Sequence, residues 1–471
     1  VSCGVSVLLW VAHCSKAEYE KCMKISADRI LVGSTPHKDW VIEINDAGRI
    51  QNVGPSSELG EPDLILNRRV LIPGTINAHS HSFQRVLRGR TQTRGPSEDN
   101  FWTWRQAMYQ AAAALEPADV YVIARQSFLE MALSGVTAVG EFHYVHHRPS
   151  GQAYVDPSEM AEAVIRAARD VGIRIVLLRT VYLRGDFDVE PSEHQRRFCE
   201  ASLDVSLGCI EALMGTVHRM QDERVSVGVA AHSVRAMPIE SIVALKTNLI
   251  QYPFHIHASE QRLEVERCKF HHGVGPVGLL ESNGVLDGLT TLVHATHLEA
   301  GEARSIKKSG AMVCVCPSTE ADLGDGILET NVLAKAGVPL SLGTDGQTLS
   351  SVLEEARRLE MNERLRTEKR TALVFEEGED CAVPCLEAAT VGGAQALGLE
   401  AGQIATGLWA DLVSVDLDAP TLAGLDDSSL LSGIIFSADA RAIQDVMVGG
   451  KWIVRDGTHV LQSESVRAFS R

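Results

Sequence analysis

The sequence predicts an α/β protein: a (β/α)8 TIM barrel with a small β-sandwich domain built from both chain ends. Three observations support this prediction. Eight short apolar runs recur along the chain, amphipathic stretches separate most of them, and histidines and carboxylates gather where the runs end. Strand patterns that alternate with helix patterns predict parallel strands, and eight such units predict a barrel.

The eight apolar, β-branched runs are the predicted barrel strands. They occupy residues 69–81, 136–146, 174–183, 225–233, 254–260, 290–298, 311–320 and 339–346. Helix-like segments lie between most of them, for example 157–172, 299–310 and 328–338. We therefore assign residues 69–399 to a metal-dependent catalytic barrel.

The two flanks, residues 1–68 and 400–471, consist of short strand patterns with the hairpin signals DAG, VGG and RDG. We expect them to meet as one composite β-sandwich beside the barrel. The apolar run within residues 1–14 has no basic start and is too short to span a bilayer, so we predict a strand there rather than the remnant of a signal sequence.

Composition narrows the class of protein. The 471 residues are 45% hydrophobic and 22% charged, as in ordinary globular proteins, and the net charge of −17 argues against a nucleic-acid partner. Ten cysteines show no disulfide framework, which favours reduced thiols and a cytoplasmic location. No membrane partner is expected. An acidic small-molecule substrate stays possible, because a pocket can be locally positive on an acidic protein.

Polar residues end nearly every predicted barrel strand. In strand order they are His79 and His81, then Glu141, His143 and Tyr144, then His232, His257 with Glu260, His294, Glu320 and Asp345. Barrel enzymes carry their catalytic residues at the C-terminal face of the strands. Core packing does not explain so many polar groups at one end, so we expect an active site there.

Four of these residues, His79, His81, His257 and Asp345, form a plausible site for one divalent metal ion. His79 and His81 are two residues apart, so in a strand both imidazoles point to the same face. Imidazole suits Zn²⁺, and a catalytic zinc brings the pKa of bound water near neutrality. An isolated His-x-His pair is often structural. The other two residues at further strand ends favour the metal site.

Several motifs resemble the amidohydrolase superfamily, specifically its mononuclear aminohydrolase branch. They are NAHSHSFQR (77–85), FWTWR (101–105), EFHYVHH (141–147), AHSVRA (231–236), HIHASEQ (255–261), LVHATH (292–297) and STEADLGDG (318–326). Within that branch the sequence is most similar to the formimidoylglutamate deiminase family. The resemblance implies zinc-dependent hydrolysis of N-formimidoyl-L-glutamate to N-formyl-L-glutamate and ammonia, a step of histidine degradation, and it implies a homodimer.

Three residues are the predicted catalytic groups. Glu260 lies three residues after a predicted ligand, so it would act as acid/base at the substrate nitrogen. His294 could hold or deprotonate the attacking water. Asp345, also a ligand, could pass a proton to the departing ammonia. The alternative for Glu260 is a solvated carboxylate at a strand end.

The resemblance also implies the substrate contacts. Arg105 and Arg235 would bind the two substrate carboxylates, because a guanidinium pairs with a carboxylate through two parallel hydrogen bonds. Gln84, Tyr144 and His232 would add hydrogen bonds. Taken alone, Arg105 within FWTWR could simply stack on the neighbouring aromatic rings.

Three other functions stay open at this point. One is an aminohydrolase of a purine or another cyclic amidine, which would call for aromatic stacking and amide contacts rather than two arginines. A second is a ring hydrolase similar to imidazolonepropionase. The third is a catalytically inactive relative that serves as a binding protein, which the complete set of candidate ligands and acid/base residues disfavours.

Overall fold

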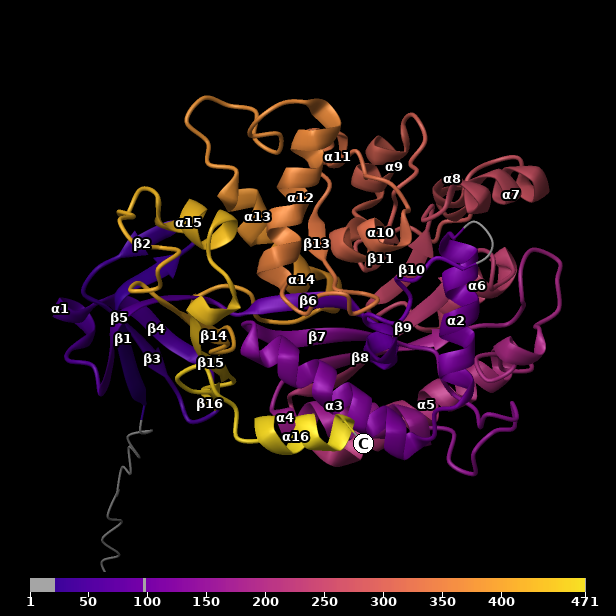
Figure 1. The fold of residues 1–471 in the computed structure, drawn as a ribbon, viewed down its shortest axis with the longest axis horizontal. Coiled ribbons are helices and arrows are strands. Elements are labelled where there is room, and N and C mark those ends of the chain that lie inside the picture. Colours follow the sequence, from indigo (N-terminus) through magenta and orange to yellow (C-terminus); the bar gives the residue numbers. More distant parts are fainter. Residues whose placement is uncertain (1–21, 96–98, 471) are drawn as a thin grey trace, which may run out of the picture.

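The computed structural model describes residues 22–95 and 99–470 and shows a barrel beside a separate sheet made by the two chain ends (Figure 1). The strand expected within residues 1–14 lies outside the described residues. In the part that is described, no helix is long and apolar enough to cross a membrane.

All eight predicted barrel strands are present and lie side by side in sequence order. Each pairs with its neighbour in parallel, and an isolated bridge between Ser80 and Asp345 joins the last strand to the first. The strands are β6 (Thr75–Ser80), β7 (Val136–His143), β8 (Arg174–Val181), β9 (Val225–Ser233), β10 (Phe254–Ala258), β11 (Thr290–His294), β12 (Met312–Val315) and β13 (Leu340–Leu342).

The chain ends form one mixed sheet with the path β16-β15-β14-β5-β1-β3-β4, in which β2 also pairs with β1. Its strands are β1 (Met23–Val32), β2 (Thr35–His37), β3 (Trp40–Ile44), β4 (Ile50–Pro55), β5 (Leu64–Pro73), β14 (Leu412–Asp416), β15 (Ile443–Val448) and β16 (Lys451–Val454). In Figure 1 the indigo strands β1, β3, β4 and β5 and the yellow strands β14, β15 and β16 accordingly lie together on the left side of the molecule.

The run 69–81, predicted as one strand, is two strands that belong to different sheets. β5 ends at Pro73 in the chain-end sheet, and β6 begins at Thr75 in the barrel. The junction is Gly74, where a Cβ would lie 2.3 Å from the Thr137 hydroxyl oxygen. A side chain at this position would collide with β7, so the close crossing between the sheets needs glycine.

Helices surround the barrel, and the predicted helical segments 157–172, 299–310 and 328–338 correspond to α4, α9 and α11. The α-helices are α1 (Ser56–Leu59), α2 (Phe101–Ala113), α3 (Pro117–Leu133), α4 (Glu159–Val171), α5 (Leu203–Met220), α6 (Ile239–Asn248), α7 (Arg262–His272), α8 (Pro276–Ser282), α9 (Glu302–Ser309), α10 (Pro317–Leu323), α11 (Thr330–Ala336), α12 (Val352–Thr367), α13 (Ala382–Ala389), α14 (Val391–Leu397), α15 (Leu430–Phe436) and α16 (Gln462–Phe469). Short 3-10 turns are η1 (Ser82–Leu87), η2 (Glu193–Gln195) and η3 (Ala440–Ala442).

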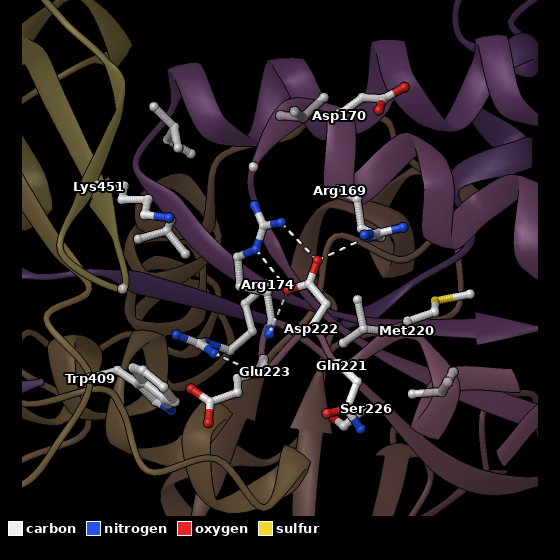
Figure 2. A pocket seen from close by; sticks show the side chains of 18 of the residues that line it. Arg169, Asp170, Arg174, Met220, Gln221, Asp222, Glu223, Ser226, Trp409 and Lys451 are labelled. Atoms are coloured by element: carbon white, nitrogen blue, oxygen red, sulfur yellow. Dashed lines mark hydrogen bonds and ion pairs between the residues drawn. The ribbon is translucent and has the colours of Figure 1, made fainter. Parts of the chain in front are cut away.

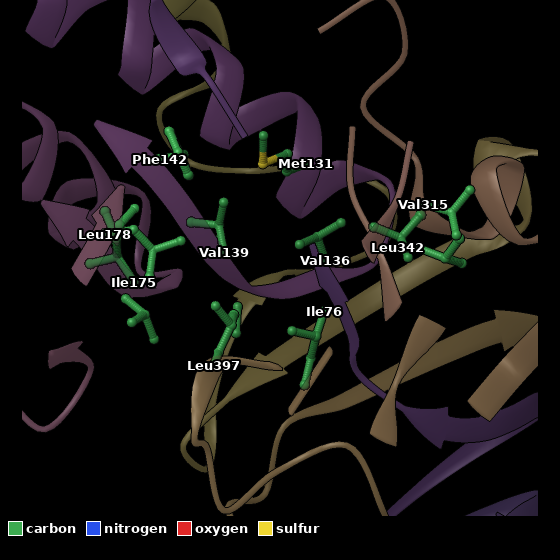
Figure 3. Close-up of a cluster of buried hydrophobic side chains, with 14 of the residues drawn as sticks. Ile76, Met131, Val136, Val139, Phe142, Ile175, Leu178, Val315, Leu342 and Leu397 are labelled. Carbon is green, nitrogen blue, oxygen red and sulfur yellow. The ribbon is translucent and has the colours of Figure 1, made fainter. Parts of the chain in front are cut away.

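The barrel strands are buried on both faces, which is why they read as continuous apolar runs. Figure 3 shows part of this core: Ile76 of β6, Val139 of β7 and Ile175 of β8 come together with Leu397 of α14. The helix α14 is also tied to the strands by His255, whose Nε2 donates to the Ala396 carbonyl at 2.8 Å. This histidine therefore has a structural role.

The N-terminal ends of the barrel strands meet the chain-end sheet around a pocket (Figure 2). Arg174, the first residue of β8, is buried and pairs with Asp411, with 3.2 Å between Nε and Oδ2. Its guanidinium carbon also lies 4.5 Å from the ring centre of Trp409. These contacts join the two parts at the end of the barrel away from the histidines, so the opposite end is left for the candidate site.

Candidate active site

The predicted metal ligands converge at the C-terminal end of the barrel. Donor atoms of His79, His81, His257 and Asp345 all lie within 4.8 Å of one another, and all four residues are buried. The Nε2 atom of His79 is 3.2 Å from Nε2 of His81 and 3.2 Å from Nε2 of His257. The Asp345 carboxylate is 3.5 Å from His79 and 3.3 Å from His81. This group could hold one metal ion.

Backbone carbonyls set the orientation of two of the imidazoles. Nδ1 of His81 donates to the Phe142 carbonyl at 2.9 Å, and Nδ1 of His257 donates to the His232 carbonyl at 2.9 Å. Each ring thereby keeps its hydrogen on Nδ1 and presents an unprotonated Nε2 to the centre. Burial lowers the pKa of His79 to about 3 and lowers the pKa of His81 and His257 as well. Neutral imidazoles with converging lone pairs fit a bound cation.

A second set of titratable groups lies beside these ligands. Nε2 of His294 is 3.8 Å from Glu260 Oε1 and 3.6 Å from Asp345 Oδ2, and its Nδ1 donates to Glu320 at 3.3 Å. Burial raises the pKa of Glu260 to about 7, although His294 and Arg235 oppose the shift. Burial lowers the pKa of His294, but Glu260, Glu320 and Asp345 together raise it well above its ordinary value. Protons can therefore be held and exchanged here near neutral pH.

The backbone at this end of the barrel is strained where it carries functional side chains. His294 has φ of 72° and Asp345 has φ of 42°, both in the left-handed region that non-glycine residues avoid. Close packing of β13 on β6 adds a further constraint, since a Cβ on Gly343 would lie 2.7 Å from Cβ of His79. Tertiary packing thus holds these groups in backbone conformations that the local chain would not favour by itself.

One pocket brings the predicted site residues together. Those that line it are His81, Gln84, Arg105, Tyr144, His232, Arg235, His257, Glu260, His294 and Asp345. His79 lies deeper and is fully buried. Glu320, which the sequence places at the end of a strand, is instead in the first turn of α10 and contacts the site through His294. The individual roles of these residues stay predictions.

The two arginines differ in how they are paired. Arg105 stacks on aromatic rings, with its guanidinium carbon 4.6 Å from the centre of Trp102, and its buried Nε has no hydrogen-bond partner among the described residues. Arg235 is buried and donates from Nε to Glu264 at 3.3 Å, while its Nη2 is 3.9 Å from Glu260. Arg105 is therefore the less compensated cation of the pocket.

Sequence reasoning missed several contributors. Tyr182, Tyr109, Trp104, Met108, Phe101 and Leu323 also line the pocket. Tyr182 immediately follows β8, so the rule that functional groups follow barrel strands could have identified it. Glu264 lies one helical turn after Glu260 and accepts its backbone N–H at 3.1 Å. In the sequence, the only indication of this contact is that Glu260 and Glu264 are four residues apart.

The side chain of Gln84 forms a hydrogen bond through its nitrogen but not through its oxygen. Gln84 Nε2 donates to the Tyr144 hydroxyl at 3.1 Å, and Gln84 Oε1 is buried without a partner in the described part of the chain. His232 packs its ring 5.4 Å from that of Tyr144. A polar atom that is buried and unpaired beside a pocket suits a ligand that completes the hydrogen bond.

Several known proteins resemble this chain in sequence or in fold. The model of the family described as "Amidohydrolase family" matches residues 70–453. A formimidoylglutamate deiminase from Pseudomonas aeruginosa is 38% identical over 447 residues, 94% of this chain and 97% of that protein. A 5-methylthioadenosine/S-adenosylhomocysteine deaminase from Haloarcula marismortui is 29% identical over 91% of each chain. The crystal structure of an amidohydrolase from Brucella melitensis matches with a TM-score of 0.88 and 33% identity, covering 95% of this chain and 98% of that one.

Proposed function

The chain belongs to the amidohydrolase family and is a hydrolase of C–N bonds, and from this premise we propose that its substrate is N-formimidoyl-L-glutamate. The products would be N-formyl-L-glutamate and ammonia, in histidine degradation. The observation that carries the proposal is a single pocket in which two arginines lie beside the candidate metal ligands and a buried glutamate. A substrate with two carboxylates and one amidine matches these three features.

His79, His81, His257 and Asp345 would hold the metal ion, and we propose Zn²⁺ because three imidazole nitrogens and one carboxylate suit it. When bound, a divalent ion supplies Lewis acidity that makes water a nucleophile near neutral pH. The formimidoylglutamate deiminase from Pseudomonas aeruginosa, which aligns with 94% of this chain, supports the choice of substrate but not of metal.

Proton transfer is assigned to the chain's own side chains. The oxygen of water forms a bond to the formimidoyl carbon, and the bond from that carbon to the terminal nitrogen breaks. One proton of the water passes to Glu260 and the second, from the hydroxyl group of the adduct, passes to Asp345, while His294, 3.6 Å from Asp345, holds the water by a hydrogen bond. Glu260, with a pKa raised to about 7 by burial, and Asp345 then each deliver their proton to the terminal nitrogen, which thereby gains two hydrogens and leaves as ammonia.

Substrate orientation follows from the charges in the pocket. Arg105, which no carboxylate of the described chain neutralises in a hydrogen-bonded pair, binds one substrate carboxylate. Arg235 binds the other while Glu264 holds its Nε edge. The free Gln84 carbonyl oxygen accepts a substrate N–H, and Tyr144 and His232 complete the polar wall. A purine substrate would leave the Arg105 guanidinium group without an anion.

The test is ammonia release from a panel of N-formimidoyl-L-glutamate, guanine, adenosine and uncharged formamidine. We expect activity on the first, and Arg105→Met and Arg235→Met should each cost about 2–5 kcal/mol in kcat/KM with metal content unchanged. Lysine at either position should restore little of the lost kcat/KM, because an ammonium group cannot form the two parallel hydrogen bonds that a planar guanidinium group makes with a carboxylate. Formamidine turnover should change far less.

Arg148→Met is the matched control, because this exposed arginine also stacks on an aromatic ring, that of Tyr154, outside the pocket. Near-normal kcat/KM on N-formimidoyl-L-glutamate in both pocket variants would refute the arginine clamp. Deamination of a purine with no activity on N-formimidoyl-L-glutamate would refute the proposed substrate.

A further inference from the structure

Tyr182 occupies a position in the pocket to which no role has been given so far. It follows β8 directly, is buried, and lines the same pocket as Arg105 and Arg235. Its ring centre is 4.6 Å from that of His232. Among the barrel strands, β8 is the one at whose C-terminal end the sequence suggested no polar site residue. Tyr182 supplies a polar group at that strand end.

The side chain of Gln195 determines how the Tyr182 hydroxyl is used. The Oε1 atom of Gln195 accepts hydrogen bonds from the Ser192 backbone N–H at 3.1 Å and from the Ser192 hydroxyl at 2.8 Å. Its Nε2 donates to the Gly185 carbonyl at 3.0 Å and to the Tyr182 hydroxyl oxygen at 2.8 Å. Because a carbonyl only accepts, the amide cannot be turned round, and the oxygen of Tyr182 must act as an acceptor.

The hydroxyl hydrogen of Tyr182 is consequently directed elsewhere. Among the described residues it has no acceptor. Burial raises the pKa of this phenol well above its ordinary value, with Arg105 and Arg235 opposing the shift, so the hydrogen is retained. A phenol that is protonated and already accepts from Gln195 is a strengthened donor toward an anion.

The backbone holds this donor next to Arg235. The N–H groups of Leu183 and Arg184 donate to the Ala236 carbonyl, both at 2.9 Å, and the Arg184 side chain donates to the Arg235 carbonyl at 3.0 Å. The segment after β8 is thus joined to the segment that carries Arg235. The two side chains are presented to the pocket as one unit rather than as independent loops.

We propose that Tyr182 is a specificity-determining residue whose hydroxyl, oriented by Gln195, donates a hydrogen bond to one carboxylate of an acidic amidine substrate. This inference rests on the proposed function. It adds a neutral donor to the cationic contacts and makes Gln195 a positioning residue that does not itself touch the substrate.

The experiment compares Tyr182→Phe with the wild-type protein on three substrates. These are N-formimidoyl-L-glutamate, N-formimidoyl-4-aminobutyrate, which lacks the α-carboxylate, and N-formimidoyl-2-aminobutyrate, which lacks the side-chain carboxylate. We expect KM for the first to rise roughly 10–100-fold with kcat nearly unchanged, since one hydrogen bond to a charged group is lost. For the analogue without the contacted carboxylate, the two proteins should have equal KM.

Two further variants distinguish a specific loss of substrate binding from a general disturbance of the structure. Gln195→Leu frees the Tyr182 hydroxyl to rotate, so it should raise KM with the same substrate pattern but less strongly. Tyr154→Phe also removes a hydroxyl from a buried tyrosine, one that donates to Glu116 at 2.7 Å outside the pocket, and should leave KM unchanged.

The outcomes distinguish this inference from the proposed function. If the wild type releases ammonia from N-formimidoyl-L-glutamate and Tyr182→Phe keeps its KM, the inference is wrong and the proposed function stands. An equal loss on all three substrates would also overturn it, because a structural role predicts that pattern. If the wild type has no activity on N-formimidoyl-L-glutamate, the proposed function fails and the inference fails with it.

Discussion

At the scale of single residues, Glu260 illustrates how the fold changes the chemistry of an ordinary side chain. It is buried beside His294 and 3.9 Å from Arg235, and burial raises its pKa to about 7. A carboxyl group with this proton affinity can both give and take a proton near neutral pH. The sequence position three residues after His257 predicted a role in proton transfer, and the environment makes that role chemically reasonable.

We expect Glu260→Gln to retain its metal and lose activity. The carboxamide keeps the shape of the side chain but cannot transfer the proton, a contribution of about 10²–10⁴-fold in kcat. Ammonia-release kinetics and elemental analysis of the same preparation measure both effects. Glu266→Gln, on the exposed side of the following helix, is the matched control and should be unaffected. Near-normal kcat in Glu260→Gln would exclude it as the acid/base.

At the scale of elements, the approach of β13 to β6 determines where two metal ligands meet. A Cβ on Gly343 would lie 2.7 Å from His79 Cβ and 2.8 Å from the His79 carbonyl oxygen. We expect Gly343→Ala to cost about 1–3 kcal/mol of unfolding free energy and to weaken metal retention, since the two strands must separate. Denaturant unfolding and metal content after dialysis are the measurements.

Gly208→Ala provides the control for this substitution. Gly208 is exposed within α5, and a Cβ there meets no atom within 4 Å. In a helix interior this change should stabilise the protein by about 0.5–1 kcal/mol. If Gly343→Ala behaved in the same way as Gly208→Ala, the close contact between β13 and β6 would not constrain the site.

A second prediction at this scale concerns the contact between α10 and α12. Glu355 of α12 is fully buried and accepts the Ser318 backbone N–H at 2.9 Å, and burial raises its pKa to about 8. The folded protein therefore binds this proton more tightly than the unfolded chain, whose carboxyl keeps its usual pKa of 4.5. The stabilisation is present below the unfolded pKa and is lost as the pH rises through the folded pKa.

Glu355→Gln removes this titration because its amide stays neutral. Between about pH 5 and pH 8 the variant should lose less unfolding free energy than the wild type, by about 3 kcal/mol. Urea unfolding at a series of pH values, at constant metal concentration, gives the comparison. Parallel pH profiles for the two proteins would show that Glu355 does not gain its proton affinity on folding.

At the scale of the whole molecule, one metal ion should link the fold and the activity. Without a cation, the lone pairs of three imidazole nitrogens face one another at the barrel mouth, with two Nε2 pairs only 3.2 Å apart. Chelation should therefore lower Tm and abolish activity, and one equivalent of Zn²⁺ per chain should restore both. An ion present at 100 times its Kd contributes about 2.7 kcal/mol to stability.

Calorimetry and elemental analysis test this, with His257→Asn and His271→Asn as a pair. The first removes a predicted ligand and should abolish the effect of the metal on Tm, whereas His271 is exposed on α7 and its variant should respond like the wild type. A requirement for two equivalents per chain would contradict the mononuclear site.

The sequence pattern was sufficient to predict the barrel strands and the polar residues that gather in one pocket at their C-terminal ends. All eight strands could be predicted, because strand and helix periodicity are local properties of the chain. The ligand candidates could be predicted as well, because parallel strands bring their C-terminal ends to one face. The run 69–81 shows the limit of local pattern. It reads as one apolar strand, yet the backbone passes from one sheet to the other at Gly74, where Thr137 leaves no space for a side chain.

Only the tertiary structure decided how the site residues are oriented and paired. His81 presents Nε2 to the site because its Nδ1 donates a hydrogen bond to the Phe142 carbonyl. Arg235 forms an ion pair with Glu264. The Tyr182 hydroxyl oxygen accepts a hydrogen bond from Gln195, because the contacts of the Gln195 amide with Gly185 and Ser192 fix its orientation. Each of these orientations depends on a group from another segment of the chain. The side-chain patterns of one strand or helix carry no information about such partners, because hydrogen-bond direction is set by atoms that become neighbours only when the chain folds.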